Sequence, residues 1–195
     1  MHLSKCNLFI TMCALLLLTG CGSGIRHSYQ SDVQFTSTMR LAILPFDNLS
    51  GRDKAGEKVT EYLFQSLSRS EKIHVAESGT VYDALRRNRI RSTTVLTGQQ
   101  IDTLATALGV THLLTGSVLD YSEQDNQYLG KVPTVAFTVS LIDVSTGQTV
   151  MTATANDRGD RRSFLFGIGS IKSSDLLAKR LADDVASRLA SRVEK

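Results

Sequence analysis

Residues 134–144 decide the fold class of this chain, and they read Thr-Val-Ala-Phe-Thr-Val-Ser-Leu-Ile-Asp-Val. Large apolar side chains occupy every second position from Val135 to Leu141, and small or polar side chains occupy the positions between them. A period of two with one apolar side predicts an antiparallel strand with one buried face. The next residues, Ser145-Thr146-Gly147-Gln148, predict a hairpin turn into another strand at residues 149–155.

Three further strands are predicted before this hairpin. Arg40–Phe46 is a nearly continuous apolar run of strand length, which is typical of a central strand buried on both faces. Residues 73–76 and 112–121 have the apolar character of two more strands.

Four helices are predicted from apolar residues that recur every three or four positions. They cover residues 55–70, a segment starting at Ser78 or Thr80, a segment from the N-cap Thr97 to a stop at Gly109, and residues 174–192. The order β-α-β-α-α-β-β-β-α predicts an α/β fold. We therefore expect one domain over residues 39–195, a mixed β-sheet of about five strands covered by helices.

Length, composition and charge agree with this assignment. The chain has 195 residues, of which 42% are hydrophobic and 21% charged, so long disorder, collagen and coiled coil are excluded. Lys and Arg number 22 against 19 Asp and Glu, a formal net charge of +3. This balance argues against a protein that binds nucleic acid through its overall charge.

The first 21 residues follow the charged, apolar, small order of a secretory signal, with Lys5 ahead of an apolar run from Leu8 to Leu18. The run is about half of the ~20 residues that a helix needs to span a bilayer. The residues Leu18-Thr19-Gly20-Cys21 resemble the lipobox of bacterial lipoproteins. That resemblance implies cleavage of residues 1–20 and covalent attachment of diacylglycerol and an N-acyl chain to Cys21.

Several expectations follow from a lipid on Cys21. Cys6 and Cys13 would leave with the signal, so the mature chain could form no internal disulfide. Three acyl chains hold a protein stably on a membrane. Gly22 replaces the aspartate that favours inner-membrane retention in enterobacterial lipoproteins, which implies the periplasmic face of the outer membrane. Residues 21–38 are polar and serine-rich and predict a short flexible tether.

Three motifs carry a likeness to a known family. They are Leu-Ala-Ile-Leu-Pro-Phe-Asp-Asn-Leu-Ser at 41–50, Gly-Val-Thr-His-Leu-Leu-Thr-Gly-Ser-Val at 109–118 and Leu-Ile-Asp-Val-Ser-Thr-Gly-Gln at 141–148. In this order they resemble the CsgG-type lipoprotein superfamily, which shares an α/β fold with the amino-terminal domain of TolB and with the LpoB activator of peptidoglycan synthases. The resemblance covers about residues 40–190 and implies an envelope lipoprotein.

The chain departs from the curli secretion channel, whose subunits insert two transmembrane hairpins after the strands that match residues 112–121 and 149–155. Residues 122–131 are short and polar, which predicts that the first hairpin is absent. At the second place, residues 156–173, only Phe164–Ile168 is apolar. We therefore expect a CsgG-like module without pore hairpins.

No constellation predicts catalysis, a metal or a cofactor. Gly51 and Gly56 have the spacing of a phosphate-binding loop, but Glu57 stands where that loop needs lysine, so a turn and a helix start are expected instead. No nucleophile motif is present. The mature histidines have no partners at ligand spacing; they are His27, His74 and His112. We expect a protein that is not an enzyme and has no cofactor beyond the lipid on Cys21.

Two basic clusters are candidate partner-binding sites. Arg86, Arg87, Arg89 and Arg91 follow one another at the end of a helix. They fit either a solvated helix end, where positive charge complements the macrodipole, or a docking patch for an acidic partner or anionic lipid. The second cluster consists of Arg158, Arg161 and Arg162, and it precedes Phe164 and Phe166. Aromatic residues beside arginines are typical of a protein-binding edge, but they also fit a segment folded back into the core.

The sequence therefore predicts an outer-membrane-anchored periplasmic lipoprotein that acts as a non-catalytic interaction module in envelope assembly or secretion. Its expected partners are outer-membrane lipid, reached through the acyl anchor, and an unidentified envelope protein; nucleic acid is not expected and a homo-oligomer stays open. The alternatives are an activator of a peptidoglycan synthase, a subunit of a curli-type secretion channel, and an enzyme that acts on cell-wall material.

Overall fold

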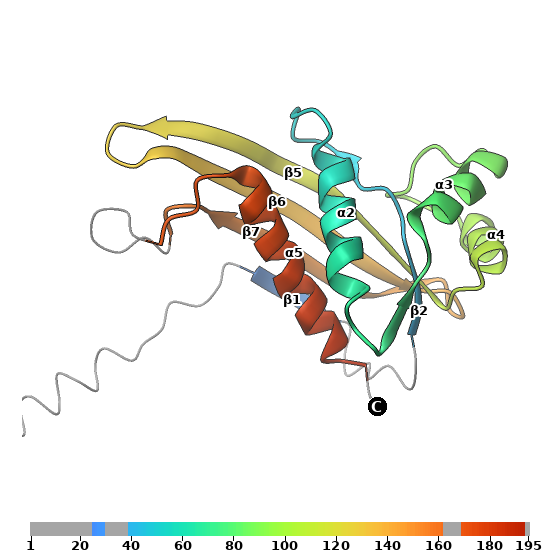
Figure 1. The fold of residues 1–195 in the computed structure, drawn as a ribbon. Coiled ribbons are helices and arrows are strands. Elements are labelled where there is room, and N and C mark those ends of the chain that lie inside the picture. Colours follow the sequence, from blue (N-terminus) through green and yellow to red (C-terminus); the bar gives the residue numbers. More distant parts are fainter. Residues whose placement is uncertain (1–24, 30–38, 162–168, 194–195) are drawn as a thin grey trace, which may run out of the picture.

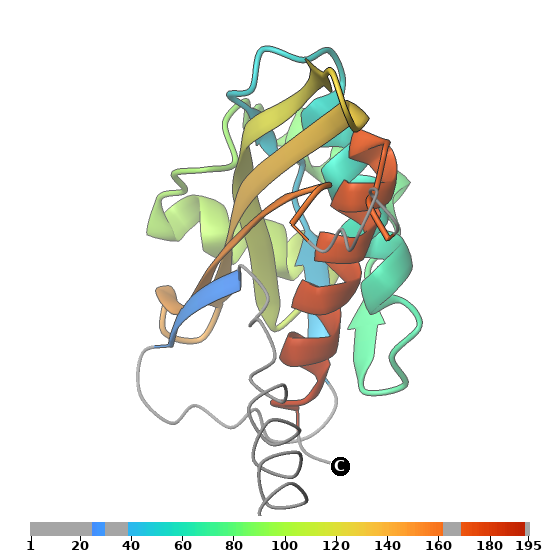
Figure 2. The same ribbon diagram turned by 90° about the vertical axis from the view of Figure 1, so that its left-hand side faces the viewer.

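A computed structural model describes residues 25–29, 39–161 and 169–193 of the chain. Their strands form one mixed sheet of seven strands in the order β1-β7-β6-β5-β2-β4, and the short β3 pairs with β5. The four helices cover parts of both faces (Figures 1 and 2). The predicted α/β fold with a mixed sheet in one domain is confirmed, with two short strands more than expected.

Strand β2 (Met39–Ile43) lies in the middle of the parallel part of the sheet, between β5 and β4 (Ile73–Val75). Its side chains alternate between two cores. Leu41 and Ile43 belong to the larger hydrophobic cluster, whereas Ala42 belongs to the smaller one. The prediction of a strand buried on both faces is confirmed, because helices pack on both sides of β2.

The antiparallel part of the sheet consists of β5 (His112–Asn126), β6 (Gly130–Asp143), β7 (Gln148–Arg158) and β1 (Ile25–Tyr29). Val135, Phe137, Val139 and Leu141 of β6 are fully buried. Residues 136, 138 and 140 between them are half-buried, so the strand has the one buried face that its alternation predicts. Gly147 has a φ of 67° in the predicted turn between β6 and β7.

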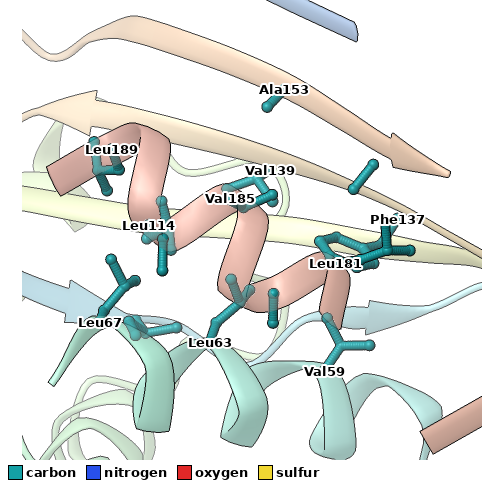
Figure 3. Packing of buried hydrophobic residues seen from close by; sticks show 14 of the residues in the cluster. Val59, Leu63, Leu67, Leu114, Phe137, Val139, Ala153, Leu181, Val185 and Leu189 are labelled. Atoms are coloured by element: carbon teal, nitrogen blue, oxygen red, sulfur yellow. The ribbon is translucent and has the colours of Figure 1, made fainter. Parts of the chain in front are cut away.

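Helices α2 (Ala55–Leu67) and α5 (Ser174–Ala190) lie side by side on the larger core. Figure 3 shows Val59 and Leu63 of α2 on the same side as Leu181 and Val185 of α5, with the strand residue Val139 next to Val185. The leucines and alanines that recur every three or four residues in α5 form its buried face. Burial of a Leu or Val side chain contributes about 1.5–3 kcal/mol, so this layer is the main source of stability.

Helices α3 (Ser78–Arg87) and α4 (Gly98–Leu108) pack on the smaller core at the other side of the sheet. Thr97 forms a capping box with Gln100, whose backbone N–H donates to Thr97 Oγ1 at 3.3 Å. Gly109 ends α4 with a left-handed φ of 63°. Both signals were read correctly from the sequence.

Two glycines allow Phe46 to enter the core directly after β2. A Cβ on Gly116 would lie 2.4 Å from the Phe46 ring, and a Cβ on Gly56 would lie 2.4 Å from the Phe46 carbonyl oxygen. The Phe46 ring meets Phe137 edge to face, with 6.5 Å between the ring centroids. Gly56 therefore permits the close approach of α2 to the sheet, which agrees with the expected helix start rather than a phosphate-binding loop.

The segment between the predicted signal and β2 differs from expectation. Ile25–Tyr29 lies within the predicted flexible tether, but it forms β1 and pairs antiparallel with Met151–Ala155 of β7. The polar residues carry no alternation that would predict a strand. The backbone groups at the edge of β7 can accept any strand, which explains why polar residues pair there.

The polar residues 122–131 lie between the predicted strands 112–121 and 134–144, and most of them extend these two strands. β5 continues to Asn126 and β6 starts at Gly130, so most of these residues form the outer half of a β-hairpin. Figure 1 shows this hairpin extending beyond α5 at the end of the sheet opposite α3 and α4. The exposed outer residues of β5 are Glu123, Gln124, Asp125 and Asn126, which keeps the arm hydrophilic.

Candidate functional site

The first basic cluster lies where α3 ends. Ile90 N donates to Leu85 O at 3.0 Å, and Arg89 N donates to Arg86 O at 3.2 Å. These two bonds form a Schellman motif, in which the residue after the cap adopts a left-handed conformation and is usually glycine. Here that residue is Arg89, with a φ of 55°.

The arginines of this cluster are exposed, and most of them have no acidic partner. Arg86 Nη2 lies 2.8 Å from Asp83 Oδ1 of the preceding turn. Among the residues that the structure describes, Arg87, Arg89 and Arg91 have no carboxylate within ion-pairing distance. Three guanidinium groups are therefore held on a short, well-ordered turn with their hydrogen-bonding capacity free for a ligand.

Three shallow hollows adjoin this turn, and all of them are lined by Asn88. Their volumes are about 430, 270 and 160 Å³. Two of them share Thr103, and two share Ala107, so they run together into one groove between α3 and α4. We call this depression the α3–α4 groove; half of its lining residues carry a hydroxyl or amide side chain.

The second basic cluster is largely neutralised. Arg158 donates to Asp160 through both Nε and Nη2, at 3.1 and 2.8 Å. Arg161 Nε lies 3.5 Å from Asp157 Oδ1. Because these carboxylates already occupy the guanidinium groups, Arg158 and Arg161 form a less favourable anion site than the first cluster.

Asp157 and Arg180 form a buried ion pair that the sequence did not reveal. The Asp157 side chain is 3% exposed, and Arg180 of α5 donates to its Oδ2. Arg180 Nε is buried with no hydrogen-bond partner in the described part of the chain. The two residues join β7 to α5 and are 23 positions apart, a separation that no local pattern marks.

A second hidden polar cluster joins α2, α5 and β5. Lys58 Nζ lies 2.8 Å from Asp175 Oδ1, and the Tyr121 hydroxyl donates to the same carboxylate. Burial raises the pKa of Tyr121, and the hydrogen bond to Asp175 adds to this rise. Burial alone would raise the pKa of Asp175, but the hydrogen bonds from Lys58 and Tyr121 outweigh it and hold that pKa below its usual value. This cluster fixes the start of α5.

The histidines occupy unremarkable strand positions. His74 is an exposed residue of β4, and His112 is half-buried at the start of β5. Burial lowers the pKa of His112, against the opposing effect of the Asp143 charge. The Thr111 hydroxyl lies 2.9 Å from His112 Nδ1. Within the described ranges no three His, Cys, Asp or Glu side chains come together as a metal site.

Four of the predicted site residues lie outside the described part of the chain: Cys21, Arg162, Phe164 and Phe166. The structure places the two basic clusters at different ends of the sheet, because Arg86–Arg91 follow α3 whereas Arg158 and Arg161 lie at the end of β7 (Figure 1). They therefore do not form one site. Of the helices that the structure describes, none has the length and hydrophobicity to cross a membrane.

Comparison with known proteins gives a fold and no family. No family model matches the chain, and no curated protein matches it in sequence. Solved structures do match. The PelC dodecamer from Paraburkholderia phytofirmans aligns with 88% of this chain and 98% of its own, at 19% identity and a TM-score of 0.55.

Lipoprotein GNA1162 from Neisseria meningitidis aligns with 78% of this chain and 99% of its own, at 19% identity and a TM-score of 0.55. The C-terminal domain of LpoB from Escherichia coli aligns with 66% of this chain and 89% of its own, at 16% identity and a TM-score of 0.48. The chain thus has the fold of the first two proteins. The likeness to CsgG and TolB stays a prediction.

Proposed function

We propose that this chain is a lipid-anchored accessory protein of the bacterial cell envelope, which acts by binding other proteins and carries no catalytic site or cofactor. The observation that carries the proposal is the lipobox-like Leu18-Thr19-Gly20-Cys21, which stands directly before a domain with the fold of a Neisseria lipoprotein. Few sequences with an unrelated role would combine an acylation motif at this place with this fold.

The position of β1 agrees with an anchor on Cys21. Only three residues separate Cys21 from Ile25, the first residue of β1. At 3.3–3.6 Å per residue, four steps of chain reach at most about 14 Å. An acylated Cys21 would therefore hold the domain close to the bilayer, with little freedom to move away.

Mass spectrometry and membrane fractionation test the anchor. We expect the mature amino terminus to be Cys21 carrying three acyl chains, and we expect Cys21→Ser to move the protein from the membrane to the soluble fraction. Cys6→Ser and Cys13→Ser are matched controls and should leave it in the membrane, because both residues lie in the predicted signal. A mature chain that starts elsewhere and carries no fatty acid refutes the proposal.

The same cells test the location. Separation of inner and outer membranes by density should recover the protein with the outer membrane, since Gly22 replaces the retention aspartate. Recovery with the inner membrane would contradict the outer-membrane part of the proposal and leave the anchor intact.

A second candidate is a ring-forming subunit of a secretion apparatus. It is favoured by the PelC match, because that protein is described as a dodecamer. Native mass spectrometry of the lipidated protein in detergent distinguishes the two roles: a closed ring of many copies supports a secretion subunit, whereas a monomer supports an accessory protein. If the protein is a monomer, stimulation of a purified peptidoglycan synthase tests the synthase-activator alternative.

A further inference from the structure

We propose that the α3–α4 groove and its arginine turn form a docking site for an acidic segment of another protein. The inference deepens the proposed accessory role, on which it rests, because it names the chemistry of the partner. The anchor on Cys21 is used only to argue against a lipid ligand, and the peptide-binding measurement does not require it, so the two proposals can fail separately.

The charge of the molecule is concentrated at this surface. The turn and the two helices beside the groove carry four arginines, Arg86, Arg87, Arg89 and Arg91, against two aspartates, Asp83 and Asp102. The whole chain has a formal net charge of +3, so two of its three net positive charges lie at this surface. An acidic ligand would therefore be attracted to this surface.

The backbone conformation of Arg89 also supports a docking site at this turn. A left-handed backbone is unfavourable for a residue with a Cβ, and glycine would satisfy the Schellman motif without that strain. Strained residues that persist in a fold are concentrated at functional sites. Arg87, Arg89 and Arg91 are all exposed around this turn, and each guanidinium can bind a carboxylate through two hydrogen bonds.

The groove favours a polypeptide over other anions. Asn88, Gln99 and Thr103 offer amide and hydroxyl groups, which can bond the N–H and C=O groups of a peptide backbone. Asp102 lies in the same groove, where its carboxylate can accept hydrogen bonds from peptide N–H groups.

The position of the site also argues against a lipid surface as its ligand. Figure 1 shows α3 and α4 at one end of the sheet and the β5–β6 hairpin at the other. Ile25 pairs with Ala155 near the hairpin end of β7, so Cys21 can reach a membrane only from that side within its short span. The arginine turn then points away from the anchored bilayer and toward other proteins.

Peptide binding to the full-length chain in neutral detergent tests the inference. A fluorescent glutamate-rich peptide should bind, and its affinity should fall as salt rises, whereas the same peptide with glutamine in place of glutamate should not bind. The variant Arg87→Glu, Arg89→Glu, Arg91→Glu should weaken binding at least about tenfold, since three ion pairs become repulsive. The matched control Arg52→Glu, Lys54→Glu, Lys179→Glu changes the net charge equally and should bind like the parent.

Arg89→Gly separates binding from folding. It should raise the melting temperature by roughly 2–4 °C, because the strain is relieved, and yet weaken peptide binding. Arg89→Lys should retain most of the binding. If Arg89→Gly raised the stability and left peptide binding unchanged, the Arg89 side chain would not contribute to binding. The backbone conformation of Arg89 would then not support a docking site.

Two results would overturn the inference. One is equal binding of the acidic peptide by the parent, the arginine variant and the control variant. The other is displacement of the peptide by phosphatidylglycerol added to the micelles, with the lipid bound through the same arginines, which would identify the site as a lipid site. If the chain proves to be unlipidated and still binds the peptide, this inference stands and only the proposed lipid anchor is refuted.

Discussion

Arg89 and Lys54 are the two residues other than glycine with positive φ among the described parts of the chain. A left-handed conformation costs about 1–2 kcal/mol for an ordinary residue. Lys54 precedes α2 and makes no side-chain cap bond. Lys54 adopts this conformation at the start of α2, and Arg89 adopts it after the end of α3. A glycine or asparagine would fit either position without the strain. Arg89 is one of the residues that we propose to bind an acidic segment of another protein.

A residue-scale prediction concerns Asp175. We expect Asp175→Asn to lower the free energy of unfolding by about 1 kcal/mol at neutral pH, because the amide loses the ion pair with Lys58 and accepts a weaker hydrogen bond from Tyr121. Thermal melts of parent and variant over a range of pH measure the difference.

The pH dependence of this difference has a definite sign. The folded-state pKa of Asp175 lies below the unfolded value of about 3.9. The stabilisation is therefore complete above pH ~4 and is lost as the pH falls through the folded pKa. Asp120→Asn is a control, because this half-buried aspartate of β5 has no ion pair within the described residues. A difference that persists unchanged at pH ~2 would contradict the assignment.

Local signals at the ends of a helix could be predicted from the sequence, whereas ion pairs between distant residues could not. The N-cap at Thr97 and the stop at Gly109 are local signals, and the structure bears out both. Asp157 with Arg180 and Lys58 with Asp175 are pairs joined only by the packing of α5 on the sheet and on α2. Their members are 23 and 117 positions apart, so no spacing rule could have matched them.

At the scale of elements, periodicity located all the helices in the described part of the chain and each described strand that contributes large apolar residues to a core. β1 and β3 were missed, because Ile25–Tyr29 has only one aliphatic residue in a polar, serine-rich stretch, and Asp47–Asn48 has only two residues. The outer half of the β5–β6 hairpin was missed for the same reason. It buries few of its side chains, so its strands are set by the register of the inner half and not by hydrophobicity.

An element-scale prediction concerns β1. We expect His27→Pro with Ser28→Pro to detach β1 from β7 and to lower the free energy of unfolding by about 2 kcal/mol, since proline cannot donate to the ladder. Hydrogen exchange should then show faster exchange at the amides of Met151–Ala155. The control Ser31→Pro with Gln34→Pro lies between β1 and β2 and should leave these amides protected. Equal exchange in both variants would mean that β7 does not depend on β1.

At the scale of the whole molecule, the sheet separates two ends with different chemistry. One end has α3, α4 and the arginine turn, and the other has the hydrophilic β5–β6 hairpin with Tyr128, which is 93% exposed (Figure 1). β1 enters the sheet near the hairpin end, since Ile25 pairs with Ala155. An anchor on Cys21 thus gives the molecule an orientation, with the hairpin toward the bilayer.

This orientation can be measured with single labels. A mature chain acylated at Cys21 has no other cysteine, so a cysteine placed at Tyr128 or at Val95 takes one fluorophore. Val95 is 80% exposed and lies between α3 and α4 in the chain. In vesicles with quencher-bearing lipids, we expect the label at residue 128 to be quenched more strongly than the label at residue 95. If the protein floats with the vesicles and both labels are quenched equally, the proposed orientation is refuted, but the proposed lipid anchor is not.

The pairing of β1 with β7 has a consequence for how the chain matures. Ile25 meets Ala155 across 130 positions, so this strand can join the sheet only after almost the whole chain has been exported. If Cys21 is acylated as proposed, the modified residue lies four positions before Ile25, the first residue of β1. We therefore expect Cys21 to be acylated while the rest of the domain is still being exported, before β1 pairs with β7.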